Sequence, residues 1–347
     1  MSKTAIVLFN LGGPDSLEAV RPFLFNLFND PAIIALPQPW RWMIAWLIAA
    51  RRAPIARGIY ERLGGGSPLR ANTEAQALAL RTCLGENYRV FVAMRYWHPY
   101  AEETATAVAE WGAEEIVLLP LYPQFSTTTT ASSLAAWQRA AITAGLSAAT
   151  RMICCYPEEP GFIAALTTEI HRVLARWPPS EKRRLLFSAH GLPERIVARG
   201  DPYRWQVERT VAALRGALAL PDLDSVICYQ SRVGPLKWLG PSTDAEIRRA
   251  GAEGVGLIVV PVAFVSEHSE TLVELDIDYR HLAAEAGVPS YIRIPTVGTA
   301  PSFIAGLANL VRGAQEHRRR LPCPADGERH CPADRSGCLC SLASAAA

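Results

Sequence analysis

The stretch LLFSAHGLP at residues 185–193 decides the fold, because it joins a short apolar run to a loop of serine, histidine, glycine and proline. A continuous apolar run without polar alternation is typical of a strand that is buried on both faces of a parallel sheet. Parallel sheets bind ligands beyond the carboxyl ends of their strands, which is where His190 falls. The stretch therefore predicts a parallel sheet with a functional residue at its edge.

The same combination recurs along the chain and predicts two similar halves. Stretches rich in alanine, leucine and charge separate most of the apolar runs, so strands and helices alternate in the prediction. A proline-rich stretch at residues 177–180 divides the runs into two groups of four, which predicts an α/β protein with two Rossmann-like domains, each a four-stranded parallel sheet flanked by helices. The eight runs are Ala5–Phe9, Val90–Met94, Ile116–Leu119, Met152–Cys155, Leu185–Phe187, Val226–Tyr229, Leu257–Val260 and Tyr291–Ile294.

Three parts of the chain follow from these groups. We expect an N-terminal domain at residues 1–151, to which a helix at about residues 302–320 returns. We expect a C-terminal domain at residues 152–301. Residues 321–347 form a cysteine-rich C-terminal tail.

The composition excludes several classes of protein. Half of the 347 residues are hydrophobic, which is enough for a large buried core. The 35 basic and 33 acidic residues are well mixed and leave a net charge of +2, so we expect no nucleic-acid partner. Neither Gly12–Gly13 nor Gly64–Gly66 has the spacing of a nucleotide-binding loop. Residues 1–10 lack the features of a signal peptide, so we expect a cytoplasmic protein.

A file of carboxylates near the end of the second half is the strongest chemical signal. Its members recur at i, i+4 and i+8, a spacing that aligns them on one face of an α-helix: Glu270, Glu274 and Asp278. Such a row alone is usually a solvated helix face. This row, however, follows a strand that ends near Phe264 and contains His268, so its first turn should face the site of His190. Two imidazoles and a file of carboxylates can bind a divalent cation, accept protons or do both.

Residues 39–54 contain three tryptophans and several aliphatic residues flanked by arginines. The segment is too short to span a bilayer, which needs about 20 apolar residues. Tryptophan and arginine together favour a helix at a membrane interface or a hydrophobic lip over an apolar ligand. An ordinary core helix is equally compatible with this pattern.

Four of the eight cysteines lie within 18 residues of the tail and are separated by seven, six and one residues: Cys323, Cys331, Cys338 and Cys340. In a reducing compartment, four thiols in a loop-rich segment favour a metal centre over disulfides. The spacing does not separate zinc from an iron–sulfur cluster, and an unstructured tail with incidental thiols is the alternative. The other four, Cys83, Cys154, Cys155 and Cys228, are expected to be small buried hydrophobic residues.

Six motifs in consistent order resemble the ferrochelatase family: Leu8–Pro14, Gly64–Pro68, Arg95–Tyr96, Ser188–Pro193, Gln230–Pro235 and Ser266–Leu272. The resemblance extends from about Thr4 to about Leu321. It implies the chelatase fold, in which two Rossmann-like halves face a porphyrin cleft. It also implies a lyase, protoporphyrin ferrochelatase, which inserts Fe(II) into protoporphyrin IX to form protohaem, with release of two protons, in the last step of haem biosynthesis.

The resemblance assigns roles to individual residues. It implies that His190 accepts pyrrole protons or meets the iron, and that Glu270 is paired with it as a second acceptor or ligand, with a pKa raised by burial. It implies that protons or metal are relayed by His268, Glu274 and Asp278. The residues expected to contact the porphyrin are Leu11, Arg62, Arg95, Tyr96, Ser126, Trp238 and Phe264.

The tail then resembles that of family members with a 2Fe–2S cluster. Those members often take one cysteine ligand from the loop after the third strand, but residues 124–130 of this chain contain none. The ligands would be the four tail cysteines, or Cys154 or Cys155 would replace Cys323, and zinc is the alternative metal. Glu267 also stands where close relatives often carry aspartate, which keeps the charge and changes the reach.

Other functions compete with this interpretation. A cobalt or nickel chelatase would share the two domains and the histidine, whereas a porphyrin carrier would need the aromatic walls without the carboxylates. A nucleotide-binding oxidoreductase is the weakest interpretation, since its fingerprints are missing. The hydrophobic lip favours protoporphyrin over the more carboxylated coproporphyrin and indicates peripheral contact with the inner face of the cell membrane. A monomer and a homodimer are both compatible with the sequence.

Overall fold

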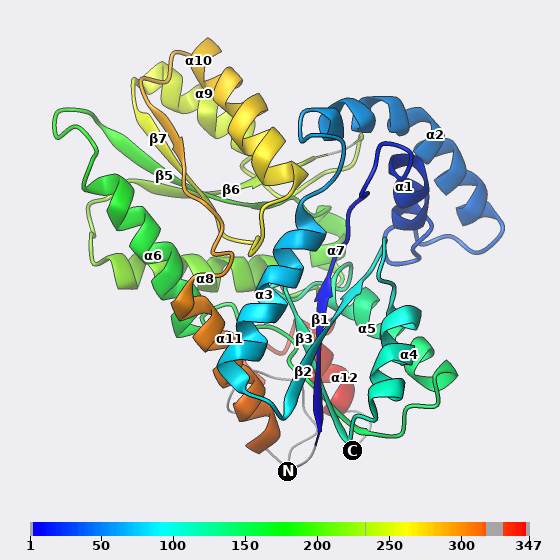
Figure 1. Cartoon of the computed structure of the whole chain (residues 1–347). Coiled ribbons are helices and arrows are strands. Elements are labelled where there is room, and N and C mark those ends of the chain that lie inside the picture. Colours follow the sequence, from blue (N-terminus) through cyan, green and yellow to red (C-terminus); the bar gives the residue numbers. More distant parts are fainter. Residues whose placement is uncertain (1–2, 233, 317–328, 345–347) are drawn as a thin grey trace. The chain divides into compact units, whose positions relative to one another are not determined.

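The computed structural model describes residues 3–232, 234–316 and 329–344, which form two compact units (Figure 1). The first unit contains the described residues of Met1–Cys155, Leu307–His330 and Cys338–Ala347. The second contains those of Tyr156–Gly306 and Cys331–Gly337. Both units are therefore completed by residues from the C-terminal end of the chain.

The first unit is built on a four-stranded parallel sheet in the order β2-β1-β3-β4. Its strands are β1 (Thr4–Asn10), β2 (Tyr88–Met94), β3 (Glu115–Pro120) and β4 (Ala149–Met152). All seven residues of β1 are buried, which explains why its sequence shows no polar alternation. On one face, Val7 and Phe9 pack in a cluster with Val108 of α4 (Ala101–Trp111) and Trp137 of α5 (Thr130–Thr143).

The remaining helices of this unit are α1 (Val20–Phe28), α2 (Trp40–Glu61) and α3 (Leu69–Leu84). Helices α1 and α2 form a hairpin in Figure 1 and share a cluster of buried residues that includes Phe23, Ala49 and Tyr60. Helix α11 (Pro301–Glu316) begins in the second unit and ends in the first, where Gln315 donates hydrogen bonds to Thr4 and Glu115. Among the described residues, no helix is both long enough and apolar enough to cross a membrane.

The second unit repeats the architecture of the first. Its strands are β5 (Arg183–His190), β6 (Ser225–Gln230), β7 (Gly256–Pro261) and β8 (Tyr291–Arg293), in the order β6-β5-β7-β8. Figure 1 shows α6 (Pro160–Leu174) and α8 (Tyr203–Leu218) on one face and α9 (Thr243–Glu253) and α10 (Tyr279–Glu285) on the other. The shorter helices of this unit are α7 (Glu194–Ala198) and the π-helix η1 (Glu270–Asp278), whereas α12 (Leu339–Ser344) belongs to the first unit.

The predicted fold class is confirmed: each unit has one parallel four-stranded sheet with the central strand first in sequence. The fourth strand was predicted at the wrong place. It covers Ala149–Met152, whereas the apolar run at Met152–Cys155 continues beyond it. Ile153 donates one further hydrogen bond to Leu118, and the two cysteines are buried without belonging to the strand. An apolar run indicates that a segment is buried, but a buried segment is not always paired in a sheet.

Candidate active site

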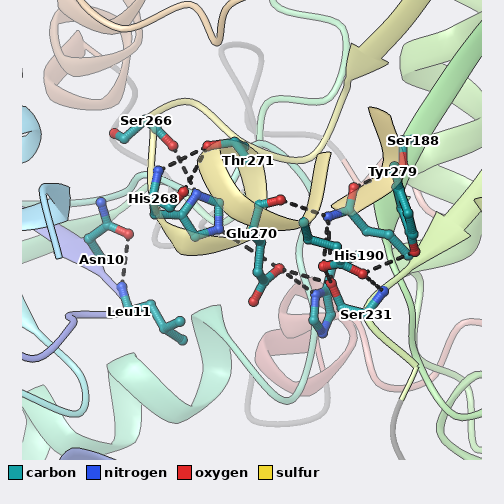
Figure 2. A network of polar contacts seen from close by, with 12 residues as sticks. Asn10, Leu11, Ser188, His190, Ser231, Ser266, His268, Glu270, Thr271 and Tyr279 are labelled. Atoms are coloured by element: carbon teal, nitrogen blue, oxygen red, sulfur yellow. Dashed lines mark hydrogen bonds and ion pairs between the residues drawn. The ribbon is translucent and has the colours of Figure 1, made fainter. Parts of the chain in front are cut away.

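The functional residues of the second unit lie where strands β5 and β6 end and where η1 begins after β7. His190 is the last residue of β5 and is paired in register with Gln230, the last residue of β6. Glu270 is the first residue of η1. Figure 2 shows His190, Glu270 and Ser231 pointing toward one another. The carboxyl edge of the sheet therefore brings an imidazole, a hydroxyl and a carboxylate together.

The central contact is an ion pair of His190 and Glu270. The distance from Nδ1 of His190 to Oε2 of Glu270 is 2.8 Å. The side chain of His190 is 42% exposed and that of Glu270 is 27% exposed, so the pair is open to a ligand. Nε2 of the buried His268 lies 3.8 Å from the same carboxylate oxygen. Two imidazoles thus flank one carboxylate.

The pair shifts the protonation of both partners. Burial opposes the charged imidazolium of His190, but the adjacent Glu270 carboxylate outweighs this and raises the pKa of His190. Burial alone would raise the pKa of Glu270, yet the charge of His190, its hydrogen bond to Glu270 and the nearby His268 hold that pKa well below its usual value. The predicted rise in the pKa of Glu270 is therefore wrong, because the contact with two imidazoles dominates over burial.

The carboxylates lie on a π-helix and not on the predicted α-helix. Hydrogen bonds from i to i+5 widen each turn, so residues four apart remain on one face. Ser231 contacts the first two carboxylates of this helix. Its hydroxyl lies 3.4 Å from Oε2 of Glu270 and donates a short hydrogen bond to Glu274. Asp278 is exposed at the last residue of η1.

Glu274 is held by several donors at once. It accepts hydrogen bonds from the Ser231 amide at 2.8 Å, the Tyr279 hydroxyl at 3.0 Å and the Gln230 side chain at 3.3 Å. Burial and the nearby charge of Glu270 raise the pKa of Glu274 despite these donors. Ser231 has φ of 62°, a left-handed conformation that is uncommon for serine and is often found at functional sites. The site therefore contains a carboxylate that takes up protons more readily than the one beside His190.

Ser231, Gln230 and Tyr279 were not predicted as site residues. Gln230 ends strand β6 and Ser231 follows it, so the rule that ligands bind at strand ends could have identified them. Tyr279 carries no such signal, because it is one residue beyond η1 in a helical stretch.

Aromatic residues border the ion pair within the second unit. The ring of Phe264 lies 4.7 Å from that of His268 and 6.5 Å from that of His190. A Cβ atom added to Gly191 would lie 2.7 Å from the Gln230 carbonyl and 3.3 Å from the ring of Trp238. Glycine is therefore required next to His190, and the two predicted porphyrin contacts of this unit, Phe264 and Trp238, lie near the catalytic candidates.

In the first unit, Arg95 and Tyr96 meet at the buried side chain of Asp30. Arg95 donates to Asp30 at 2.8 Å and to Ser132 at 2.7 Å, and the Tyr96 hydroxyl donates to Asp30 at 2.8 Å. Ser132 also donates a short hydrogen bond to Asp30. Burial and the Asp30 charge raise the pKa of Tyr96 well above its usual value, so its hydroxyl stays protonated. Asp30 thus fixes both predicted porphyrin contacts, and no sequence pattern had indicated it.

The other predicted residues of this unit differ in exposure. Leu11 is half-buried directly after β1, and its carbonyl accepts a hydrogen bond from the Tyr96 amide. Ser126 is buried, and its hydroxyl shares a hydrogen bond with that of Thr128. Arg62 is exposed at the end of α2.

The tail cysteines are only partly described. Cys331, Cys338 and Cys340 are buried, Cys340 is disulfide-bonded, and Cys323 lies outside the described residues. Within residues 3–232, 234–316 and 329–344, no three His, Cys, Asp or Glu side chains are placed to share a metal ion. The predicted tail metal centre includes Cys323 and so lies partly outside the described residues. The adjacent Cys154 and Cys155 are buried, and their Sγ atoms lie 3.1 Å apart.

Comparison with known proteins identifies the family. The family model for ferrochelatase matches residues 3–315. This chain belongs to the ferrochelatase family. Proteins named ferrochelatase are 52% identical in Caulobacter vibrioides, where the match covers 97% of both chains, and 53% identical in Phenylobacterium zucineum, where it covers 97% of this chain and 98% of the relative. The ferrochelatase family model ends before the tail begins.

Two solved structures share the fold. SirB from Bacillus subtilis with Fe3+ has a TM-score of 0.51 at 15% identity, and the match covers 90% of this chain and 95% of that chain. The sirohydrochlorin chelatase SirB from Bacillus subtilis subspecies spizizenii in complex with cobalt has a TM-score of 0.53 at 13% identity, covering 91% and 97%. The chain therefore shares the fold of these chelatases.

Proposed function

We propose that this chain inserts Fe(II) into protoporphyrin IX to form protohaem and releases two protons, in the last step of haem biosynthesis. Membership of the ferrochelatase family supports the reaction class, that of a lyase. The observation that carries the residue assignment is the 2.8 Å contact of His190 with Glu270 at the carboxyl edge of the second sheet. Iron and porphyrin are both substrates in this proposal.

The reaction requires groups that accept protons. It also requires a negative charge that stabilises an acceptor once it is protonated. A free porphyrin holds two N–H protons, and the ring accepts iron only as these leave. Neutral His190 takes a proton, because the Glu270 carboxylate stabilises the imidazolium that forms. The low pKa of Glu270 makes it a poor final acceptor and a good counter-charge. His190 and Glu270 also supply the nitrogen and oxygen atoms that ferrous iron can bind as it enters.

The second step moves protons away from the ring. Glu274 has the raised pKa, and the Ser231 hydroxyl lies between the two carboxylates, 3.4 Å from Glu270 and hydrogen-bonded to Glu274. A hydroxyl can accept one proton while it donates another. We therefore assign the relay to Ser231 and Glu274, with His268 beside Glu270 and the exposed Asp278 at the solvent end. The proton on His190 passes through Glu270 and Ser231 to Glu274, so His190 becomes neutral again and accepts the second pyrrole proton.

The same proposal assigns porphyrin contacts to individual residues. Phe264 and Trp238 supply apolar surface near His190, and Leu11 supplies it in the first unit. Arg95, held by Asp30 together with Tyr96, supplies a fixed charge. Arg62 and Ser126 are assigned to polar contacts with the propionates.

The test is an anaerobic assay of the purified protein with protoporphyrin and ferrous iron, which follows the loss of porphyrin fluorescence. We expect turnover by the unmodified chain and none by His190→Ala. His281→Ala is the matched control, because His281 is 78% exposed on α10. Tight porphyrin binding without turnover by the unmodified chain would favour a carrier, and turnover with cobalt or nickel alone would favour another chelatase.

A peripheral membrane contact belongs to the same proposal. Helix α2 exposes large apolar side chains, among them Trp40 at 61% and Ile55 at 72%, with Trp42 and Trp46 about half exposed. Arg51 and Arg52 lie on the same helix and favour anionic headgroups. We expect the protein to sediment with vesicles of anionic phospholipid, and Trp40→Ala with Trp46→Ala to reduce this. Sedimentation velocity without lipid tests whether the chain is a homodimer.

The predicted 2Fe–2S cluster is a separate proposal. It is supported by three buried tail cysteines, Cys331, Cys338 and Cys340, since thiolates are the usual ligands of such clusters. The fourth ligand is Cys323, Cys154 or Cys155. The cluster needs Cys340 as a thiolate, so it and the Cys340 disulfide exclude one another. Visible absorption of anaerobically purified protein, and its loss in Cys338→Ser, tests this proposal, and metal analysis distinguishes zinc.

A further inference from the structure

Residues 331–337 of the tail pack within the second unit, at the corner between helices α7 and α8. We call these residues the tail loop. The amide of Gly337 donates a hydrogen bond of 3.1 Å to the carbonyl of Gly200. At the other end of the loop, the buried side chain of Gln206 donates to Sγ of Cys331 at 3.3 Å. The loop is therefore attached at both ends to the first turns of α8 and the residues before it.

The corner is shaped to receive the tail loop. Gly200 has φ of 93°, and a Cβ atom there would lie 2.9 Å from the backbone nitrogen of Ser336. A Cβ atom on Gly337 would lie 3.1 Å from the Gly200 carbonyl. Two glycines thus permit a backbone-to-backbone contact that any side chain would obstruct. Such a close approach makes the position of the corner sensitive to the tail loop.

The same corner supports His190. Asp201, which is buried, accepts a hydrogen bond of 2.9 Å from the amide of Tyr203 and so fixes the start of α8. The Tyr203 hydroxyl donates to the backbone carbonyl of His190 at 3.1 Å. The pairing of β5 with β7 ends at Ser188, two residues before His190, so Tyr203 holds His190 where that strand pairing has stopped.

We infer that the tail loop is a positioning element for His190, which acts through Gly200 and Tyr203. The path is continuous: Gly337 holds Gly200, the neighbouring Asp201 holds Tyr203, and Tyr203 holds the backbone of His190. The ferrochelatase family model ends at residue 315, so the tail loop lies outside the part of the chain that the model matches. The inference rests on the proposed function, because turnover is one of its two measures.

The experiment combines Gly337→Leu, which displaces the tail loop, with Tyr203→Phe, which removes the hydroxyl that reaches His190. Gly216→Leu is the matched control, since a Cβ atom on this exposed glycine of α8 meets nothing within 4 Å. We expect kcat to fall about tenfold in each of the first two variants, with little change in KM for porphyrin, because a small displacement of a catalytic group is costly. We expect the double variant to be no slower than the single ones.

Additive losses in the double variant, or an unchanged kcat in Gly337→Leu, would overturn the inference. Gln206→Met removes the other attachment and should lower kcat in the same direction, which provides the test if Gly337→Leu does not fold. Hydrogen exchange gives a readout independent of turnover: peptides that contain His190 and Tyr203 should exchange faster in Gly337→Leu and Gln206→Met but not in Gly216→Leu. If the unmodified chain shows no turnover, the proposed function fails while exchange still decides the role of the tail loop.

Discussion

The two units share one strand order, yet the residues that end their central strands are different in kind. Strand β1 ends in Asn10. Its side-chain Nδ2 donates a hydrogen bond of 2.9 Å to the Thr73 hydroxyl, and its side-chain Oδ1 accepts one from the backbone amide of Leu11. Strand β5 ends in His190, which is paired with a carboxylate and partly exposed. Asn10 is neutral, buried and satisfied, whereas His190 can gain or lose a proton. In the same topology, therefore, the last residue of β1 has a structural role, whereas the last residue of β5 can take part in chemistry.

The charged residues near the two sheets differ in the same way. In the first unit, the buried Asp30 carboxylate accepts hydrogen bonds from Arg95, Tyr96, Ser132 and the Ala32 amide, so its charge is used to hold Arg95 and Tyr96. In the second unit, Glu270 faces two imidazoles and stays partly exposed. One carboxylate stabilises the fold and the other tunes a base.

The largest effect on activity should come from replacing His190, which ends β5, by asparagine, the residue that ends β1 in the first unit. His190→Asn keeps a polar side chain but removes the proton acceptor, so we expect kcat to fall by a factor of about 10² to 10⁴. Anaerobic turnover with ferrous iron measures this, and circular dichroism checks that the chain is folded. Activity within a few-fold of the unmodified chain would mean that β5 does not end in the catalytic base.

The next effect concerns stability in the first unit. Asp30→Asn leaves the partly buried guanidinium of Arg95 without its counter-charge, so we expect the free energy of unfolding to fall by about 3 kcal/mol. Urea unfolding measures it, with the exposed Asp222→Asn as control. A loss below the uncertainty of the extrapolation would show that Asp30 does not hold Arg95 in the way its contacts indicate.

A smaller effect separates the two roles of the carboxylate in the second unit. Glu270→Gln removes the charge that raises the pKa of His190, so the pKa of His190 falls. Since the neutral imidazole is the acceptor, activity rises with pH through the pKa of His190, and the acid limb of kcat/KM moves to lower pH in the variant. At the optimum, kcat should fall roughly tenfold, the size expected for loss of a hydrogen bond to a charged group. The exposed Glu285→Gln should move neither quantity.

The smallest effect should come from Asn10→Ala. Loss of the bond to Thr73 should lower the free energy of unfolding by about 1 kcal/mol, and kcat should stay within a few-fold of the unmodified value. Thermal unfolding and the same turnover assay measure the two quantities. A loss of turnover comparable to that of His190→Asn would erase the distinction between the two strand ends.

The sequence predicted those features that follow from apolar runs and from the residues after them. The two parallel four-stranded sheets and the meeting of His190 with the acidic file could be anticipated, because parallel strands end at one edge. Asp30 could not, since its partners Arg95 and Ser132 are 65 and 102 residues away. The π-helix has no sequence signature that separates it from an α-helix, and the fall in the pKa of Glu270 depends on distances that only the structure contains.

The discontinuity of the first unit has a consequence for synthesis on the ribosome. Strands β1 to β4 are complete by Met152, yet Gln315 of α11 bonds to Thr4 and Glu115 of the same unit. At the usual elongation rates, the ribosome needs on the order of ten seconds to make the intervening residues. During that interval the nascent first unit lacks a helix that covers it, so this is the period in which chaperones would be expected to bind.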